Sequence, residues 1–467
     1  MNSTIEKINS NELEVIQTGL NDLHRLVSVQ IDPPIKQVLD LNIIPKIISF
    51  LKHDNDQIKY NAILVLNSLS RAKNSKVIST FLKSDILGPI EELLSNNYNN
   101  QKDLKEQLVE IITNIVKKDR DSRYQVLHFN NIVSIIAANI KNGQVKSHSV
   151  STKCIAALSC TKPPPDHFYT AQFLSYLAKY LELYNNNTAD FAAENNQKQQ
   201  DECLADTLKS LSFISDNEHN SDPIVDIVNA HRCVLNLVKL LHHSSDNIVK
   251  VALRILGNLI TGDEECTQKV MDSPHFLESL KNLLSHPTKA TRKEVIWILS
   301  NTLADSPHQI QMVIDAGFVP LIIDMVYTEG GSIIKECNWV LLNIVTQGNQ
   351  QQIQYSLDQG FLKALCAIIT KLMHFVGNFE NHEEVEEEED EEGLPSNMIF
   401  PMAFDAFELL IKQSSNNPQE PSVINNIYLD ETLRLEYQTL LTNFSNSDNY
   451  GLETRTRATQ LLSSYFN

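Results

Sequence analysis

Apolar residues recur at the three- and four-residue spacing of helices over most of the chain, whereas the strict alternation typical of strands is scarce. Two stretches of this pattern, residues 292–326 and 334–369, align with each other with few gaps. Each contains K-E-x-x-W-x-x-x-N, then Q-I-Q, then Gly-Phe. Trp339 follows Trp297 by 42 residues, so the sequence contains an internal repeat.

Weaker copies of the repeat occur upstream. Arg254 lies 43 residues before Trp297, and Asn258 then stands at the Asn position. Asn67 and Asn114 mark two earlier copies. A period of about 42 residues with two or three helices per unit is typical of armadillo or HEAT solenoids, in which each unit buries its apolar stripe only against its neighbours. The sequence therefore predicts an all-α fold of the α-solenoid type.

Two segments interrupt the repeat. Residues 185–200 are polar and rich in Asn and Gln, and we predict a loop there. Residues 377–397 contain nine acidic residues within 383–392, whose mutual repulsion predicts an acidic disordered loop. Helical repeats are therefore expected over residues 5–376 and again over 398–467.

The composition favours a binding protein over an enzyme. The net charge is −19 and the pI is near 5.2, which suits basic partners and disfavours adhesion to nucleic acid or to a membrane. The seven cysteines form no CxxC pair, and we find neither an 18-residue apolar stretch nor a signal peptide. No phosphate loop, nucleophile elbow or zinc-binding HExxH motif occurs. We therefore expect no catalytic residues, no metal and no cofactor.

These residues resemble the importin-alpha family, the adaptors that bind nuclear localisation signals. The stretches ALRILGNLITGDEECTQKVM, RKEVIWILSN and KECNWVLLN are similar to the family's later repeats, PPIKQVLDLNIIPKIISFL to its first repeats, and ATQLLSSYF to its last. The resemblance extends over about residues 5–467 and is strongest over 231–372. It implies a right-handed α-solenoid of about ten armadillo repeats, a role in protein import into the nucleus, and a location in both cytoplasm and nucleus.

The resemblance also implies that basic peptides lie in the concave groove formed by the third helix of each repeat. Trp and Asn at i and i+4 share one helix face. There the Asn carboxamide can pair with a peptide backbone, and Trp rings can stack on Lys or Arg side chains at roughly 0.5–2 kcal/mol each. A carboxylate three residues before each Trp would select the cation. The alternative for the two Trp side chains is simple packing in a repeat core. The expected peptide-binding residues are Arg254, Asn258, Thr261, Glu294, Trp297, Ser300, Asn301, Glu336, Trp339 and Asn343, with Asn67 and Asn114 from the early repeats.

The early repeats depart from the family pattern. The positions of their Trp residues are occupied by Ile63, Glu110 and Ala156, so we expect them to contribute little to the binding of basic peptides. By this resemblance we expect the family's basic N-terminal segment, which binds importin-beta, to be missing, because only Lys7 and Arg25 are basic before residue 36. Importin-beta and the export receptor for importin-alpha are therefore partners by resemblance only. The alternative function is a scaffold or sequestering inhibitor that binds basic peptides without carrying them.

Overall fold

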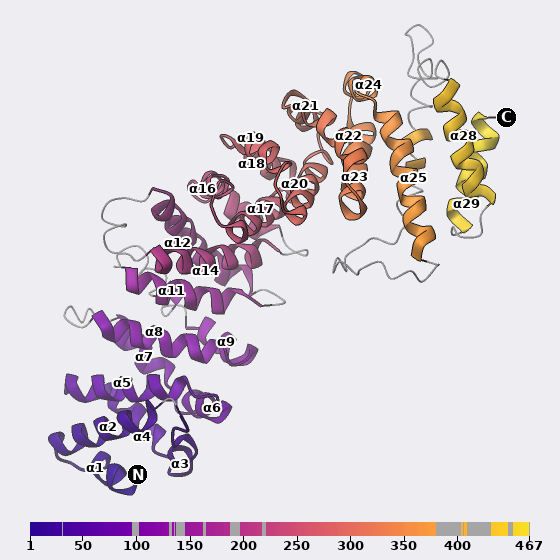
Figure 1. Cartoon of the computed structure of the whole chain (residues 1–467). Helices are drawn as coiled ribbons and strands as arrows, with labels where there is room; N and C mark the ends of the chain where they lie inside the picture. Colours follow the sequence, from indigo (N-terminus) through magenta and orange to yellow (C-terminus); the bar gives the residue numbers. More distant parts are fainter. Residues whose placement is uncertain are drawn as a thin grey trace. The chain divides into compact units, whose positions relative to one another are not determined.

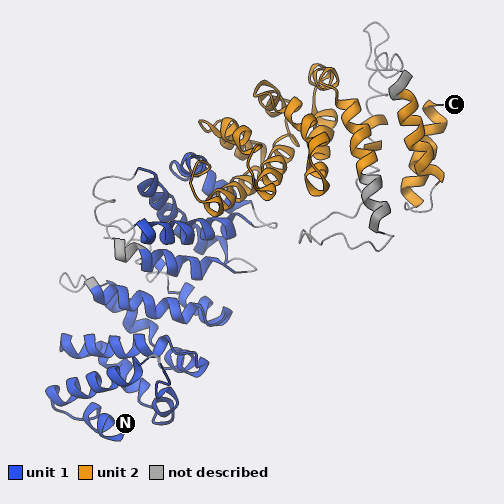
Figure 2. Cartoon of the chain, viewed as in Figure 1, with its two compact units in different colours: residues 1–239 blue, residues 240–467 orange. Residues whose placement is uncertain are grey.

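The chain consists of helices that form two compact units. All regular elements in the described residues of the computed structural model are helices, and no strand occurs among them (Figure 1). Unit 1 spans residues 1–239 and unit 2 spans residues 240–467 (Figure 2). The structure describes residues 1–29, 31–95, 102–129, 133–134, 136, 145–161, 165–186, 197–216, 221–379, 403–404, 406–408, 431–446 and 452–466.

Short helices such as α18 (Glu264–Met271) and α19 (Phe276–Leu283), with 8 residues each, and long helices such as α12 (His167–Asn186), with 20 residues, occur along the two units. The helices up to the end of unit 1 are α1 (Asn2–Ile8), α2 (Leu13–Val27), α3 (Ile35–Asp40), α4 (Ile44–Ser49), η1 (Phe50–Lys52), α5 (Asp56–Ser70), α6 (Ser75–Lys83), α7 (Leu87–Ser95), α8 (Lys102–Val116), α9 (Arg120–Leu127), α11 (Val145–Ser159), α12 (His167–Asn186), α14 (Gln197–Ser215), α15 (Asp222–Asn229) and α16 (Cys233–Leu240). Those of unit 2 are α17 (Asp246–Ile260), α18 (Glu264–Met271), α19 (Phe276–Leu283), α20 (Lys289–Thr302), α21 (Pro307–Asp315), α22 (Phe318–Thr328), α23 (Gly331–Gln347), α24 (Gln350–Asp358), α25 (Phe361–Phe379), α28 (Glu431–Asn446) and α29 (Leu452–Tyr465).

One helix per repeat packs against the equivalent helix of the next repeat. These third helices are α5, α8, α11 and α14 in unit 1, preceded by α2, and α17, α20 and α23 in unit 2. Their apolar stripes are buried on both sides; in α17, for example, Ile255, Leu256 and Leu259 are inaccessible to solvent. Because buried apolar area contributes about 25 cal/mol per Å², each third helix is stabilised by its two neighbours. The core is thus a continuous column within each unit, and the predicted all-α solenoid is confirmed.

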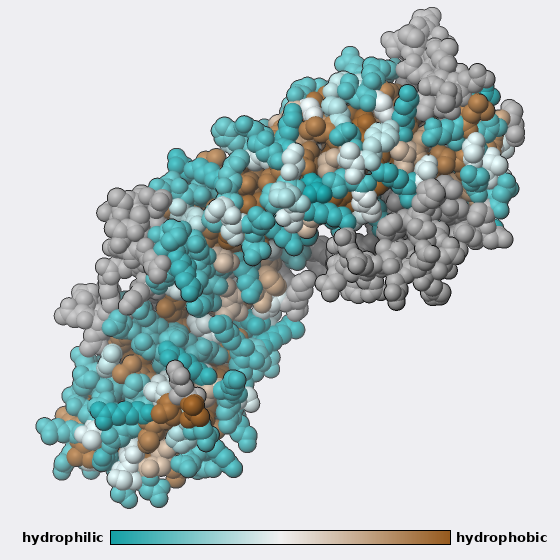
Figure 3. Space-filling view, in the orientation of Figure 1, coloured by the Kyte–Doolittle hydropathy of each residue, from teal (hydrophilic) through white to brown (hydrophobic). Residues whose placement is uncertain are grey.

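The surface visible in Figure 3 is mostly hydrophilic, and several exposed large apolar side chains belong to the first helices of unit 1 and the turns between them. Figure 3 shows hydrophilic residues over much of the visible surface of each unit, with hydrophobic residues between them. The exposed apolar side chains of the first helices and turns are Leu13, Leu26, Val29, Ile31 and Leu41.

A single residue with a left-handed backbone precedes the second helix of six repeats in the described residues. Gly317 and Gly360 have φ of +76° and +99° directly before α22 and α25. The residues at the corresponding places of four other repeats, which have φ of 47° to 63°, are Asn42, Asp85, Arg232 and His275. Asp85 follows Asn42 by 43 residues, and the steps from Arg232 to Gly360 are 43, 42 and 43 residues. The backbone conformation therefore preserves the repeat where the side chains no longer show it.

The predicted polar loop at 185–200 is shorter than expected. Helices α12 and α14 include its first two and last four residues, and 187–196 lies outside the described residues. A contact with another helix stabilises the last turn of α12, because Asn185 Nδ2 donates a hydrogen bond to the Asn236 carbonyl oxygen of α16 at 3.1 Å. Polar composition alone cannot reveal such a bond.

The predicted acidic loop and the repeats that follow it are described only in part. Residues 377–379 belong to α25, and 380–397 lies outside the described residues. Within 398–467, α28 and α29 pack together. Phe407 stacks on Tyr437 of α28 with ring centres 4.0 Å apart, so an aromatic core continues in this region.

Neither a membrane span nor a metal site is evident in the described residues. No single helix among them is long and apolar enough to cross a membrane; α21 and α22, bent by 76°, reach that length and hydrophobicity only together. No group of three or more His, Cys, Asp or Glu side chains among them is arranged to hold a metal ion.

Replacing Gly360 with Ala isolates the cost of the left-handed turn. A Cβ at this position would meet no atom within 4 Å, so only the backbone conformation is penalised, and we expect a loss of about 1 kcal/mol in stability. Gly330→Ala is the matched control, because that position is equally open but has φ of −133°. Urea denaturation of both variants gives the difference. Equal unfolding free energies would show that the turn imposes no strain.

Candidate peptide-binding site

The predicted Trp and Asn residues of the later repeats lie on neighbouring third helices of unit 2. Trp297 and Asn301 belong to α20, and Trp339 and Asn343 belong to α23, which packs against α20. Both Trp side chains are half-buried. Each Asn follows its Trp by four residues and so shares its helix face. We call this surface of α17, α20 and α23 the aromatic face; its members are Arg254, Asn258, Glu294, Trp297, Asn301, Glu336, Trp339 and Asn343.

Trp297 is held by two groups of α17. Arg254 Cζ lies 5.2 Å from the centre of the Trp297 ring, within the range of a cation–π interaction. A Cβ on Gly257 would lie 2.2 Å from Trp297 Cζ3, so a glycine is required for the ring to rest against this stretch of backbone. Trp297 therefore packs between two repeats and also contributes to the exposed face. The core-packing and peptide-binding interpretations of this residue are compatible.

Two carboxylates with little access to water accompany the Trp residues. Glu294 is 8% exposed, and its Oε1 lies 3.0 Å from Arg254 Nε in an ion pair. Burial raises the pKa of Glu294 even though the Arg254 charge acts in the opposite direction. Burial also raises the pKa of Glu336, with Lys293 opposing the shift and Glu294 adding to it. The aromatic face thus contains two desolvated carboxylates that a further cation would stabilise.

The Asn carboxamides differ in how much of their hydrogen-bonding capacity is already used. Asn343 Nδ2 donates to the Ser300 carbonyl oxygen of α20 at 2.8 Å. Asn301 Nδ2 is buried and has no hydrogen-bond partner in the described part of the chain. A buried donor without a partner costs about 1–3 kcal/mol, so Asn301 has the most to gain from a new acceptor. Asn258 occupies the equivalent position on α17 and is 8% exposed.

The two hydroxyl residues of the predicted site serve their own helices. Ser300 Oγ donates to the Trp297 carbonyl oxygen at 2.9 Å, and Thr261 Oγ1 donates to the Asn258 carbonyl oxygen at 2.8 Å. Both bonds lie in the last turn of a third helix, where backbone carbonyl groups lack partners within the helix. These hydroxyls therefore complete the helix ends beside the aromatic face.

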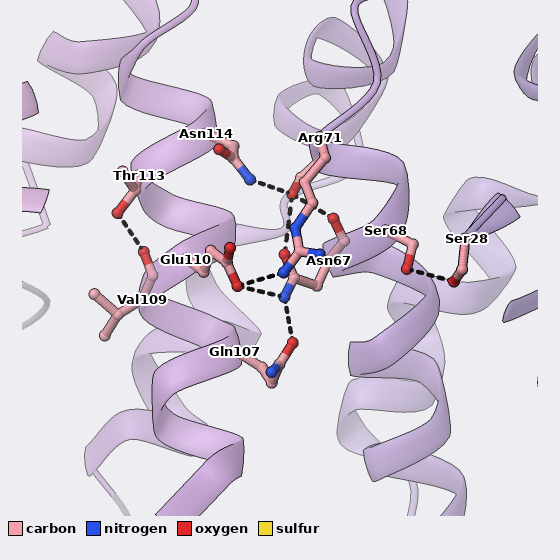
Figure 4. A network of polar contacts seen from close by, with 10 residues as sticks. Ser28, Asn67, Ser68, Arg71, Gln107, Val109, Glu110, Thr113 and Asn114 are labelled. Carbon is pink, nitrogen blue, oxygen red and sulfur yellow. Dashed lines mark hydrogen bonds and ion pairs between the residues drawn. The ribbon is translucent and has the colours of Figure 1, made fainter. Parts of the chain in front are cut away.

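The early-repeat residues Asn67 and Asn114 join a hydrogen-bond network inside unit 1 (Figure 4). Asn67 is 2% exposed, and its Nδ2 donates to Glu110 Oε2 at 2.9 Å, which links α5 to α8. Arg71 Nη2 lies 2.7 Å from the same Glu110 oxygen. Asn114 Nδ2 donates to the Ser70 hydroxyl at 2.8 Å. Both amides are thus bonded to a neighbouring third helix, and Glu110, at a Trp position, already has a cation.

Two residues that the sequence pattern did not single out take part in these contacts. Gly257 interrupts the helical pattern of α17, and a glycine inside a helix often marks a close approach by another group. Arg71 carries no comparable signal, because its partner Glu110 is 39 residues further along the chain. Ile63 and Ala156, at the other two early Trp positions, are buried and offer no aromatic wall.

Comparison with known proteins gives the class of the fold. Residues 306–346, which contain α21–α23, match the family described as Armadillo/beta-catenin-like repeat. An engineered protein aligns with a TM-score of 0.66 over 99% of this chain and 97% of its own, at 17% identity. A chain from a study of a phosphorylation switch between cadherin and beta-catenin aligns with a TM-score of 0.64 over 99% and 93%, at 14% identity. The protein is an armadillo-type α-solenoid.

Proteins of similar sequence indicate which kind of armadillo protein this chain resembles. Importin subunit alpha-3 of Arabidopsis thaliana is 29% identical over 354 residues, which are 75% of this chain and 62% of the relative. Importin subunits alpha-1b and alpha-1a of Oryza sativa are 27% and 26% identical over 78% and 64% of this chain. The chain spans 53% to 64% of the length of these three relatives. It is an importin-alpha-like armadillo protein.

Glu294→Gln should stabilise the protein at neutral pH. The folded chain raises the pKa of Glu294, so this group favours folding at acid pH, and its contribution is lost as pH rises through the folded pKa. Removing the charge should therefore raise the melting temperature at pH 7, with a smaller gain below about pH 4, where the carboxyl is protonated in both states. Glu453→Gln, at an exposed position, is the control. A lower melting temperature at pH 7 would mean that the ion pair with Arg254 outweighs the cost of burial.

Proposed function

We propose that the protein is a nuclear transport adaptor that binds basic nuclear localisation signals on the aromatic face of unit 2. The observation that carries this proposal is the recurrence of Glu, Trp and Asn at one spacing on the packed helices α20 and α23, with both Trp side chains half-buried. Relatives named importin subunit alpha support the role in transport.

An extended basic peptide suits the spacing and chemistry of this face. Packed helices lie about 8–10 Å apart, and an extended chain advances about 3.3 Å per residue, so every third residue meets a new helix. A Lys or Arg beside Trp339 would stack on the indole while its charge approaches Glu336. The carboxamides of Asn301 and Asn343 would meet the peptide backbone, which makes part of the affinity independent of sequence.

Arg254 limits the part of the face that is open to a ligand. It lies over the Trp297 ring and pairs with Glu294, so a ligand cation there must share or displace an internal one. In the described part of the chain, no cation lies over Trp339. We therefore expect the place beside Trp339 and Glu336 to bind a ligand cation more strongly than the place beside Trp297.

Substitution of the Trp residues tests the peptide site. Trp339→Ala should weaken binding of a fluorescein-labelled Lys- and Arg-rich peptide by about 1–3 kcal/mol, and Trp297→Ala by less. Gly257→Ala should also weaken binding, because its Cβ displaces the Trp297 ring without changing any charge. Fluorescence anisotropy gives the affinities.

Phe168→Ala removes an aromatic side chain that is 59% exposed in unit 1, and it should leave peptide affinity unchanged. The assignment of the site is wrong if both Trp variants bind the peptide as tightly as the wild type. Circular dichroism of each variant separates lost binding from lost folding.

Transport requires more than peptide binding, so a second experiment addresses the adaptor role. Purified protein is incubated with immobilised importin-beta, with and without a basic cargo peptide, and labelled cargo is then followed in permeabilised cells. An adaptor should increase the nuclear accumulation of the cargo. Peptide binding combined with cargo that stays outside nuclei would favour the sequestering scaffold instead.

A further inference from the structure

One third helix of unit 1, α11, carries a charge opposite to those of the aromatic face. On α20 and α23, the position three residues before each Trp holds Glu294 or Glu336. On α11 the same position, three residues before Ala156, holds Lys153. Residues at this register share one helix face, on which Glu294 is buried, Glu336 is half-buried and Lys153 is exposed. The place in the repeat that holds a carboxylate on α20 and α23 of unit 2 thus holds a lysine on α11 of unit 1.

Two further lysines lie on the helices that flank α11. Lys117 directly follows α8 and lies three residues after Asn114, so it shares the face of that residue. Lys209 lies on α14, three residues before Ser212. Helices α8, α11 and α14 pack side by side in this order (Figure 1). Both lysines are exposed.

These lysines share one carboxylate and are not neutralised by it. Asp206 on α14 is half-buried and lies within electrostatic reach of Lys117, Lys153 and Lys209. Burial nevertheless raises the pKa of Asp206, so desolvation outweighs the attraction of all three lysines. None of the three lysines makes a salt bridge with any group in the described residues. Glu202, one turn before Asp206, is the other carboxylate nearby.

A guanidinium adds to this cluster. Arg123 of α9 is half-buried, and its Nε donates to the Ala157 carbonyl oxygen near the end of α11 at 3.3 Å. This bond goes to a neutral backbone group, and the carboxylate within electrostatic reach of the guanidinium is Asp119. Cys160 lies within electrostatic reach of both Arg123 and Lys209, so the guanidinium and one of the three lysines act on the same thiol. Four cations and three carboxylates, namely Asp119 and the two on α14, therefore lie in this region, which leaves an excess of positive charge in a chain whose net charge is −19.

The neighbouring network already uses the carboxylate at the Trp position of α8. Glu110 is the carboxylate that stands at a Trp position on α8, and it is already bonded to Arg71 and Asn67 (Figure 4). That carboxylate is therefore not available to a ligand cation, whereas the lysines beyond it are open to solvent.

We propose that Lys117, Arg123, Lys153 and Lys209 form a cationic face that binds an acidic segment of a partner polypeptide. An extended chain with a carboxylate at about every third residue matches the roughly 8–10 Å separation of packed helices. The small side chain of Ala156 gives a nucleic acid base nothing on which to stack, which favours a peptide over a single-stranded nucleic acid. This proposal is independent of the function proposed for unit 2.

The test measures binding of a fluorescein-labelled decaglutamate peptide to the full chain by anisotropy at low salt. A variant with Lys117→Gln, Lys153→Gln and Lys209→Gln should bind it at least about tenfold more weakly, and the salt dependence of binding should flatten. The matched control makes the same change of charge at Lys36, Lys76 and Lys83, which are exposed lysines of α3 and α6, and should bind like the wild type.

The outcomes separate a specific cationic face from a general attraction between opposite charges. Absence of wild-type binding at millimolar peptide, or equal weakening by both triple variants, would overturn the proposal. An oligonucleotide of equal charge that binds as tightly as the peptide would also overturn it, because the face would then attract any polyanion. The variant at Lys117, Lys153 and Lys209 should still bind the basic peptide through unit 2, and this readout fails only if the function proposed for unit 2 fails or the chain unfolds.

Discussion

The packing of each third helix against the next is the constraint on which the rest of the structure depends. A third helix has an apolar stripe too wide for its own repeat to cover, so α20 is stabilised only when α17 and α23 lie against it. This arrangement fixes the helix rotation and leaves one polar edge exposed on every third helix. Side chains about 43 residues apart in sequence then lie next to one another, as Asn343 and Ser300 do. Side chains at equivalent positions of successive third helices therefore form a row across the helices, and no loop is needed to position them.

The carboxylates on the third helices differ in how far cations within the protein already neutralise them. In unit 1, Arg71 and Asn67 both bond to Glu110, so the carboxylate is satisfied within the protein. In unit 2, Arg254 satisfies Glu294 only partly, since burial still raises the pKa of that carboxyl. Glu336 has a raised pKa as well, and the attraction of Lys293 and Lys335 does not offset its burial. The desolvated carboxylates of unit 2 thus remain less compensated than Glu110 of unit 1, as the proposed binding of basic ligands there requires.

The sequence predicted the solenoid and the Trp–Asn rows because both depend on spacing along one helix. It did not predict which donors are already used, since Asn67 bonds to Glu110, a residue 43 positions away. The left-handed turns were not predicted, although the repeated glycines Gly317 and Gly360 suit this conformation. At Arg232 the same backbone occurs in a residue whose type gives no sign of it. Local rules therefore predicted the helices, while contacts between repeats determined the details of the site.

The contact between Trp297 and the backbone at Gly257 gives the aromatic face a mechanical property. The ring lies directly between α17 and α20, so the distance between these helices and the orientation of the indole cannot change independently. Stretching or bending of unit 2 at this junction would alter the shape of the aromatic face. A ligand that fixes the indole would in turn stiffen the junction. Because the same contact sets the spacing of α17 and α20 and the orientation of the indole, tension that separates the two helices would change the affinity of the aromatic face for a ligand.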